Sequence, residues 1–202
     1  MSFAAQYLEE VVEITRALDR DAIEAVVAVL AAARAAGGRL FILGVGGSAA
    51  NASHAVNDFR KIVGIETYAP TDNVSELTAR TNDEGWETSY SAWLEVSRLG
   101  SADAVLVFSV GGGSREHNVS VNLVNAIEAA RDAGAAIYGV VGAPGGTLAE
   151  LADVAILIDP PKGLRTPLVE SFQAVVWHGL VSHPELAARE GHWEMLSARA
   201  GS

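Results

Sequence analysis

Two glycine-rich turns that end in serine are the part of this sequence best suited to binding an anion. The first lies in residues 41–48 and ends at Ser48, and the second lies in residues 105–114 and ends at Ser114. Each turn follows a short apolar run typical of a buried parallel strand and precedes helix-like sequence. Glycine lets a ligand approach the backbone, while free N–H groups and the helix dipole favour negative charge. The two turns predict a pocket for a phosphorylated small molecule, although tight turns need glycine even without a ligand.

Four further side chains carry groups that bind metals or transfer protons. His54 and Asp58 lie four residues apart, on one face of the helix predicted after the first turn. Glu170 and His178 lie on the last predicted helix, about 80° apart around its axis and ~12 Å along it. They converge only if the Glu170 side chain reaches inward. Two histidines and two carboxylates suit a tetrahedral zinc ion, and they equally suit acid–base chemistry. Singly, each is also a common surface or core residue of a helix.

The elements that must position these groups alternate between strand and helix. We predict strands near residues 39–44, 65–69, 104–109, 136–142 and 154–158, and helices near residues 47–62, 86–97, 118–133, 146–152 and 167–182. Such alternation predicts a three-layer α/β/α sandwich with a five-stranded, doubly wound parallel sheet, flavodoxin-like or Rossmann-like. The ligand of such a sheet lies beyond the carboxyl ends of its strands, where both Gly/Ser turns would sit.

Residues 3–35 precede the first strand and have the pattern of two amphipathic helices. Their apolar faces consist of Tyr7, Leu8, Val11, Val12 and Ile14 in the first helix, and of Ile23, Val26, Val27, Val29 and Leu30 in the second. Because no strand of their own covers these faces, we interpret the pair as an oligomerisation element. We expect one domain over residues 1–202, with an α/β core over 38–184 and a polar, loosely ordered tail from Pro184.

Composition excludes several classes of protein. The 202 residues contain no cysteine, so the chain has no thiolate metal site and no cysteine nucleophile. A formal net charge of −11 argues against a nucleic-acid partner, because phosphate backbones recruit lysine and arginine. The N-terminus lacks the basic and apolar stretches of a secretory signal, and no apolar run approaches the ~20 residues that span a bilayer. We therefore expect a cytoplasmic protein with no membrane partner.

The run GVGGSAANASH at residues 44–54 resembles the signature of the phosphoheptose isomerases, which are sugar isomerase (SIS) domain proteins. The likeness continues at residues 72–78, 82–83, 108–114 and 170–178, and covers most of the chain. This family converts sedoheptulose 7-phosphate to D-glycero-D-manno-heptose 7-phosphate through an enediol. The resemblance implies a SIS fold, a sugar-phosphate substrate, no nucleotide cofactor, and a homotetramer, or at least a dimer, whose sites draw on more than one subunit.

The resemblance also implies roles for individual residues. The substrate's phosphate would bind Ser48, Ser109, Gly111, Gly112, Gly113 and Ser114, and the sugar site would include Asn73 and Asp83. His54, Asp58, Glu170 and His178 match four positions that hold zinc in some members of the family. In the isomerisation, His178 is assigned as the acid and either Asp58 or Glu170 as the base.

The sequence departs from the family pattern at the phosphate loop and at both acids. Residues 109–114 read SVGGGS where the family usually has STSGNS, so backbone N–H groups or a cation such as Arg115 or Arg165 must contribute more. Asp58 replaces the family's catalytic glutamate, and Glu170 replaces a glutamine. The alternatives are a non-catalytic SIS regulator or scaffold, and an isomerase of another sugar phosphate, for example in antibiotic sugar synthesis. The retained histidines and carboxylates argue against a scaffold, which needs none of them.

Overall fold

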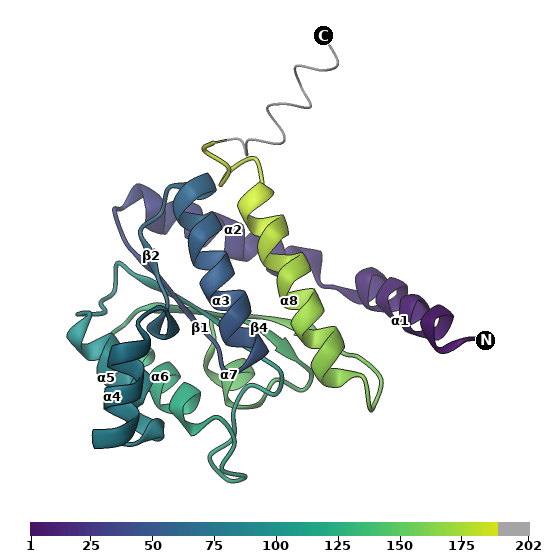
Figure 1. Cartoon of the computed structure of the whole chain (residues 1–202). Helices are drawn as coiled ribbons and strands as arrows, with labels where there is room; N and C mark the ends of the chain where they lie inside the picture. Colours follow the sequence, from purple (N-terminus) through teal and green to yellow (C-terminus); the bar gives the residue numbers. More distant parts are fainter. Residues whose placement is uncertain (190–202) are drawn as a thin grey trace.

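Five parallel strands form one sheet at the centre of the computed structural model, which describes residues 1–189 (Figure 1). The strands are β1 (Leu40–Leu43), β2 (Thr67–Tyr68), β3 (Ala104–Ser109), β4 (Ala136–Gly142) and β5 (Val154–Ile158), in the order β2-β1-β3-β4-β5. All neighbouring strands pair in parallel. The central strand β3 is buried along its whole length, which explains its unbroken apolar run. The predicted fold class is confirmed, and β3, β4 and β5 have the predicted bounds.

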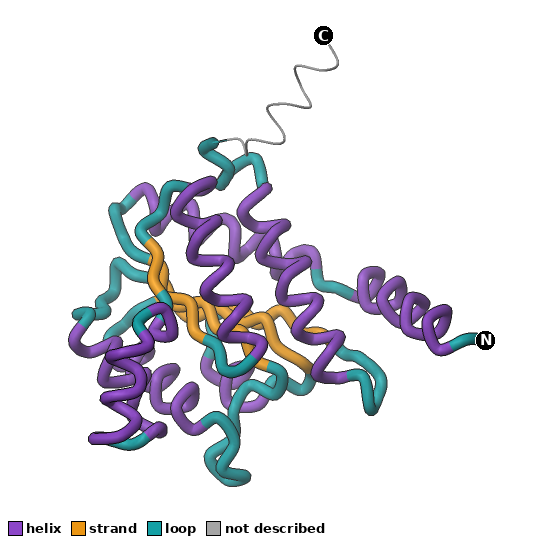
Figure 2. Tube along the Cα trace, viewed as in Figure 1, coloured by secondary structure: helices purple, strands orange, loops and turns teal. Residues whose placement is uncertain are grey.

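Helices cover both faces of the sheet (Figure 2). One face packs against α2 (Arg20–Ala35), α3 (Gly47–Asp58) and α8 (Arg165–Ser182). The other packs against α5 (Ser89–Val96), α6 (Val121–Asp132) and α7 (Gly146–Leu151). The helices α3 and α8 lie side by side in Figure 1 and are in contact along their length. This pair of helices carries all four of the predicted metal-binding or proton-transferring residues.

Three helical segments differ from the prediction. Helix α4 (Val74–Asp83) was not predicted, because it is polar and none of its residues is buried, so no apolar stripe marks it. The helix predicted over 47–62 is α-helical only to Asp58 and then continues as a π-helical turn, η1 (Phe59–Val63). The helix predicted over 86–97 consists of a short 3₁₀ turn, η3 (Trp86–Thr88), followed by α5.

The two N-terminal helices have different surroundings. The apolar face of α2 is covered by its own chain, since Val26, Val27 and Leu30 are buried in the core shared with α8 and the sheet. The expectation that the apolar face of α2 is left uncovered by its own chain is therefore wrong. In contrast, α1 (Phe3–Ala17) extends away from the body of the molecule (Figure 1), and Ile14 is its one buried residue within the described part of the chain.

The segment after α8 is held against the body, contrary to the loose tail expected from Pro184. Leu186 is fully buried, and the Arg34 guanidinium donates to the backbone oxygens of Glu185 and Leu186. The backbone N–H groups of residues 188 and 189 donate to the Ile62 oxygen in η1. Residues 190–202, which also belong to the predicted tail, lie outside the described residues. Within residues 1–189, no helix combines the length and apolar character needed to cross a bilayer.

Candidate active site

The strand order places the two Gly/Ser turns next to each other. The order β2-β1-β3-β4-β5 changes direction between β1 and β3, and such a switch point leaves a crevice at the carboxyl edge of a parallel sheet. The first turn leaves β1 and opens α3, and the second leaves β3 and leads to α6. Both turns line one pocket of about 260 Å³, which includes Ser48, Ser109 and Gly111.

Ser48 is the pocket residue with the clearest unused binding capacity. It lies in the first turn of α3 and is 1% exposed, and its Oγ has no hydrogen-bond partner among the described residues. A buried hydroxyl without a partner is unfavourable unless a ligand or water supplies one. Ser120, which was not predicted, also lines this pocket. It starts α6 with a positive φ of 49°, and the sequence prediction had placed it inside a helix.

The glycines of the second turn serve packing more than ligand binding. Gly112 and Gly113 are buried and have a φ of 79°, and a Cβ on Gly112 would lie 1.7 Å from the Gly145 backbone oxygen. The Gly112 oxygen accepts a hydrogen bond from Leu148 N at 3.0 Å, which satisfies a backbone group at the start of α7. Gly112 N donates to Ser109 Oγ at 2.9 Å. Of the three glycines predicted to contact phosphate, Gly111 alone lines the pocket.

Ser114 and Arg115 point to other partners in this structure. The Ser114 Oγ lies 2.9 Å from His117 Nδ1, and Ser114 is absent from the pocket lining. The Arg115 guanidinium forms an ion pair of 2.6 Å with Glu128. The loop after Gly113 therefore does not bring the predicted serine and arginine into the pocket within this subunit.

The two residues predicted to contact the sugar lie far from each other. Asn73 caps the start of α4 by accepting a hydrogen bond from Glu76 N at 3.2 Å, and Asp83 ends the same helix. Ten residues of α-helix separate them by ~15 Å. Both are exposed and neither lines the pocket beside Ser48. Within one subunit, they do not form a common sugar site with the two turns.

Three of the four predicted metal-binding or proton-transferring residues converge between α3 and α8. The Asp58 Oδ2 lies 3.8 Å from His54 Nε2 and 4.0 Å from His178 Nε2. One ligand atom from each residue falls within 4.8 Å of the others. The spacing of four in α3 aims His54 and Asp58 at the same place, and the packing of α8 adds His178. We call these three residues the His–Asp–His cluster.

The surroundings of this cluster fix the orientation of its rings. The Nδ1 atom of His178 lies 2.8 Å from the Ala174 backbone oxygen, which only accepts, so Nδ1 carries the hydrogen. The Nε2 atom is left to bind a metal or a proton on the side of Asp58. Trp177 is fully buried and packs against both imidazoles, with ring centroids 3.5 Å from His178 and 4.7 Å from His54. Asn57 Nδ2 donates to the other oxygen of Asp58 at 2.7 Å.

Glu170 does not join the cluster. Its carboxylate lies against Gly47 at the start of α3, where a Cβ on Gly47 would be 2.4 Å from the Glu170 Oε2. Gly47 and Asp58 are eleven residues apart in α3, about 16 Å along the axis. The four-residue set expected from the sequence is thus a three-residue set here, because Glu170 points to the other end of the seam between the helices.

Tyr90 holds the backbone of the first turn in place, and it was not predicted as a site residue. Its hydroxyl donates to the Gly44 oxygen at 2.8 Å, and its ring is fully buried between α5 and the sheet. Burial raises the pKa of Tyr90 to about 12, so the hydroxyl stays protonated and remains a donor. No local motif marks this residue, since its role depends on the packing of α5 against β1.

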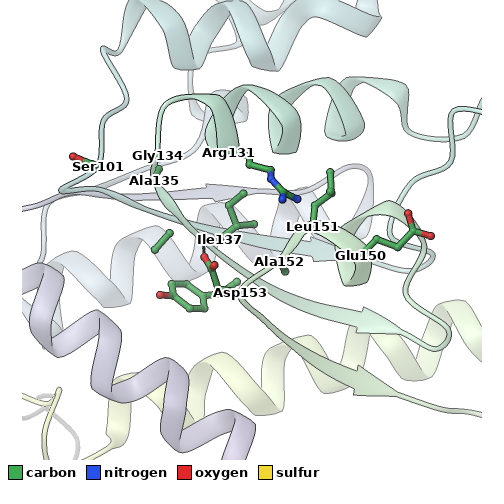
Figure 3. A pocket seen from close by; sticks show the side chains of 11 residues that line it. Ser101, Arg131, Gly134, Ala135, Ile137, Glu150, Leu151, Ala152 and Asp153 are labelled. Carbon is green, nitrogen blue, oxygen red and sulfur yellow. Dashed lines mark hydrogen bonds between the residues drawn. The ribbon is translucent and has the colours of Figure 1, made fainter.

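A further pocket, of about 600 Å³, lies at the amino edge of the sheet, where Arg131, Glu150 and Asp153 approach the ends of β4 and β5 (Figure 3). It contains none of the predicted site residues. Asp153 accepts a hydrogen bond from Ile137 N at 2.8 Å, which gives it a structural role between the two strands. The carboxyl edge therefore holds the chemistry expected from the sequence.

Comparison with known proteins agrees with this fold. A family model described as the SIS domain matches residues 6–142, more than half of the chain. A phosphoheptose isomerase of Rhodospirillum rubrum is 34% identical over 162 residues, which cover 78% of this chain and 81% of that protein. The chain belongs to the SIS domain family and, within it, to the phosphoheptose isomerases.

Two more similarities concern other proteins of this kind. The lincomycin biosynthesis protein LmbN of Streptomyces lincolnensis is 39% identical over 160 residues, which cover 73% of this chain but only 56% of LmbN. The chain thus spans little more than half the length of that relative. The structure of phosphoheptose isomerase GmhA from Neisseria gonorrhoeae has a TM-score of 0.77 at 21% identity, covering 88% of this chain and 94% of GmhA. At that identity, the similarity supports the fold.

Proposed function

We propose that this chain is an aldose–ketose isomerase that converts sedoheptulose 7-phosphate to D-glycero-D-manno-heptose 7-phosphate through an enediol, for the synthesis of nucleotide-activated heptose. The observation that carries the proposal is the His–Asp–His cluster, which shares helix α3 with the anion pocket. Relatives named phosphoheptose isomerase support the substrate. The pocket would hold the phosphate, and the cluster would act on the first two carbons.

The phosphate would bind at the start of α3. The unpartnered Ser48 hydroxyl can donate to a phosphate oxygen, and the first N–H groups of the twelve-residue helix point toward the same place. Ser109 Oγ accepts from Gly112 N, which leaves its own hydrogen to donate to the ligand. Binding the phosphate at this end helps hold the reacting carbons of the open-chain sugar in position.

The proton transfers would take place at the His–Asp–His cluster. A base removes a proton from C1 of the ketose while an acid supplies one to the oxygen on C2, which gives the enediol. The proton on the C1 oxygen is then lost as C2 is protonated, which yields the aldose. Asp58 is the base of this proposal, because it is the carboxylate in the cluster, and protonated His178 is the acid. Each such transfer contributes ~10²–10⁴-fold to the rate.

The donor set of the cluster suits a divalent metal, most simply zinc. His54 Nε2, His178 Nε2 and an Asp58 oxygen are nitrogen and oxygen ligands typical of zinc, and the bond from His178 Nδ1 to Ala174 is the usual support of a metal-binding histidine. When bound, zinc would polarise the substrate oxygens as a Lewis acid. A histidine that binds zinc through Nε2 has no proton to donate from that atom, so the acid role of His178 applies to the cluster without metal, and His54 serves as a ligand only.

Assembly belongs to the same proposal. We infer that one domain over residues 1–202 forms a homotetramer, or at least a dimer, in the cytoplasm, with the exposed face of α1 in the interface. The separation of Asn73 and Asp83 from the pocket supports this assembly, since a neighbouring subunit can bring either residue to a site that its own chain does not reach.

One observation favours a second substrate class. The relative with 39% identity is named a lincomycin biosynthesis protein, so an isomerase acting on another sugar phosphate in antibiotic synthesis is the alternative. Incubation with sedoheptulose 7-phosphate, with and without zinc, and detection of an aldoheptose phosphate test the first proposal. Turnover of other sugar phosphates but not of this one would favour the alternative. Binding without turnover of any would favour a SIS regulator.

A further inference from the structure

Arg34, near the end of α2, contacts the two chain segments that continue from the helices of the His–Asp–His cluster. Its Nη1 donates to the Val63 oxygen at 3.1 Å and to the Leu186 oxygen at 2.7 Å, and its Nη2 donates to the Glu185 oxygen at 2.9 Å. A guanidinium is planar and holds its five donors in a fixed fork, so one side chain can bind several oxygens at once. Arg34 therefore connects η1 with the segment that follows α8.

Both of these segments lie close to the cluster along the chain. The turn η1 starts directly after Asp58, and α8 ends at Ser182, four residues after His178. The N–H groups of residues 188–189 also donate to the Ile62 oxygen in η1, at 3.0 and 3.2 Å. A π-helical turn such as η1 is rare and occurs frequently at functional sites. The ends of α3 and α8 that carry the cluster are thus joined by hydrogen bonds in addition to their packing.

The cluster requires a well-defined spacing between these two helix ends. His54 and Asp58 lie on α3, and His178 lies on α8, with its Nε2 atom 4.0 Å from the Asp58 Oδ2. Zinc binds nitrogen and oxygen ligands at about 2.0–2.2 Å, with a tolerance of ~0.2 Å. A small shift of α8 relative to α3 would therefore take His178 out of reach while His54 and Asp58 stay together.

We propose that Arg34 is a positioning residue for the cluster, which fixes the spacing of α3 and α8 at which Asp58 and His178 act together. This inference rests on the metal and acid–base roles of the cluster in the proposed function. The same bonds also satisfy carbonyl groups at a helix end, which is a purely structural task. The positioning role has a distinct consequence: loss of Arg34 should weaken the cluster and spare the pocket at Ser48, which lies about 15 Å from Asp58 along α3.

Calorimetry with zinc and, separately, with inorganic phosphate tests this division. Arg34→Ala should bind zinc about tenfold more weakly than the wild type, a loss typical of removing a group that orients metal ligands. Its affinity for phosphate should stay within about twofold, because the two sites are far apart. Arg34→Lys keeps the charge but lacks the fork, so it should also lose zinc affinity, and it replaces Arg34→Ala if that variant does not fold. Arg20→Ala, at the exposed start of the same helix, is the control.

Two results of this experiment would overturn the proposal. The first is a zinc affinity of both Arg34 variants within about twofold of the wild type, which is the range of independent sites. The second is an equal loss of affinity for zinc and for phosphate, which would indicate a general loosening of the fold.

A distance measurement tests the same role without any ligand. The chain has no cysteine, so Asn57→Cys on α3 and Ser182→Cys on α8, both at exposed positions, can carry spin labels. Pulsed electron paramagnetic resonance should give a broader or longer distance distribution with Arg34→Ala than without it, and an unchanged one with Arg20→Ala. An unchanged distribution with Arg34→Ala would overturn the proposal.

The failure of the proposed function can be told apart from the failure of this inference. If the wild type binds no zinc, the metal site of the proposed function fails, and the label distances alone decide the role of Arg34. If zinc affinity and distances change as expected but no sugar phosphate is turned over, only the catalytic proposal fails.

Discussion

Only one ring nitrogen of His178 can take part in proton transfer, so a variant at this position tests the mechanism directly. Since Nδ1 is committed to Ala174, Nε2 alone faces Asp58. We expect His178→Gln to lower kcat by ~10²–10⁴-fold while the fold remains, because glutamine cannot exchange a proton at neutral pH. Steady-state kinetics on sedoheptulose 7-phosphate, with circular dichroism as the control for folding, provide the test. Near-normal turnover would contradict the assigned mechanism.

Ser48 and Ser109 should respond differently to the loss of their hydroxyls. Ser48→Ala removes a buried group without a partner, so the free energy of unfolding should stay the same or rise. Ser109→Ala removes the acceptor of Gly112 N and should cost about 1 kcal/mol. Both variants should raise KM for the sugar phosphate. Urea unfolding combined with kinetics distinguishes the two effects, and equal destabilisation of the two variants would contradict this account.

Local spacing was sufficient to predict some site residues and not others. The four-residue spacing of His54 and Asp58 determines their common direction on any α-helix, so their meeting follows from sequence. The direction of Glu170 depends on how α8 packs on α3, which a spacing of eight does not specify. The position of Ser120 depends on a positive φ, and the residue types around this position do not predict that backbone conformation.

At the scale of elements, the second turn shows which glycines the fold needs. Gly112 has a φ of 79°, and a Cβ there would collide with the Gly145 oxygen, whereas a Cβ on Gly111 would meet nothing within 4 Å. We expect Gly112→Ala to lower the free energy of unfolding by more than about 1 kcal/mol, and Gly111→Ala to change it little. Thermal unfolding of both variants is the measurement. Equal stability would show that the turn moves freely away from α7.

The amino edge of the sheet contains an ion pair that should make stability depend on pH. Asp103 is nearly buried between β1 and β3; burial alone would raise its pKa, but hydrogen bonds from Arg39 and from Gly100 N lower it below the ordinary 3.8. A carboxyl whose pKa falls on folding stabilises the native state above its unfolded pKa and loses that contribution as the pH falls.

The variant Asp103→Asn should therefore be less stable than the wild type at pH 7, and the difference should shrink as the pH falls below 3.8. Urea unfolding at pH 7 and at a pH below 3.8 measures this difference in stability, with Glu95→Gln, an exposed acid, as the control. A difference that is constant with pH would show that the loss comes from packing rather than from charge.

The strands and most helices could be predicted because their buried residues form apolar patterns in the sequence. Central strands buried on both faces, such as β3, read as unbroken apolar runs, and their bounds were predicted correctly. Helix α4 has no such apolar pattern, since none of its residues is buried. The π-helical turn after Asp58 is also unmarked, because its stability comes from distant contacts such as those of Arg34 and of residues 188 and 189.

At the scale of the whole molecule, the proposed assembly depends on the exposed face of α1. Leu8 and Val12 are 62% and 39% exposed on a helix that extends from the body. We expect a dimer or tetramer by light scattering, and a smaller species when Leu8→Glu and Val12→Glu are combined, since charge on an apolar interface opposes burial. Gln6→Glu, on another side of the helix, is the control. A wild-type monomer at micromolar concentration would contradict the assembly.

The position of α8 along the chain has a consequence for synthesis on the ribosome. His54 and Asp58 are translated more than a hundred residues before His178, and all five strands precede α8. A nascent chain that has not yet released α8 lacks the helix that covers one face of the sheet and that completes the His–Asp–His cluster. Premature termination before this helix would thus remove His178 and expose the apolar face of the sheet that α8 covers, so the fold and the proposed chemistry are both completed late in translation.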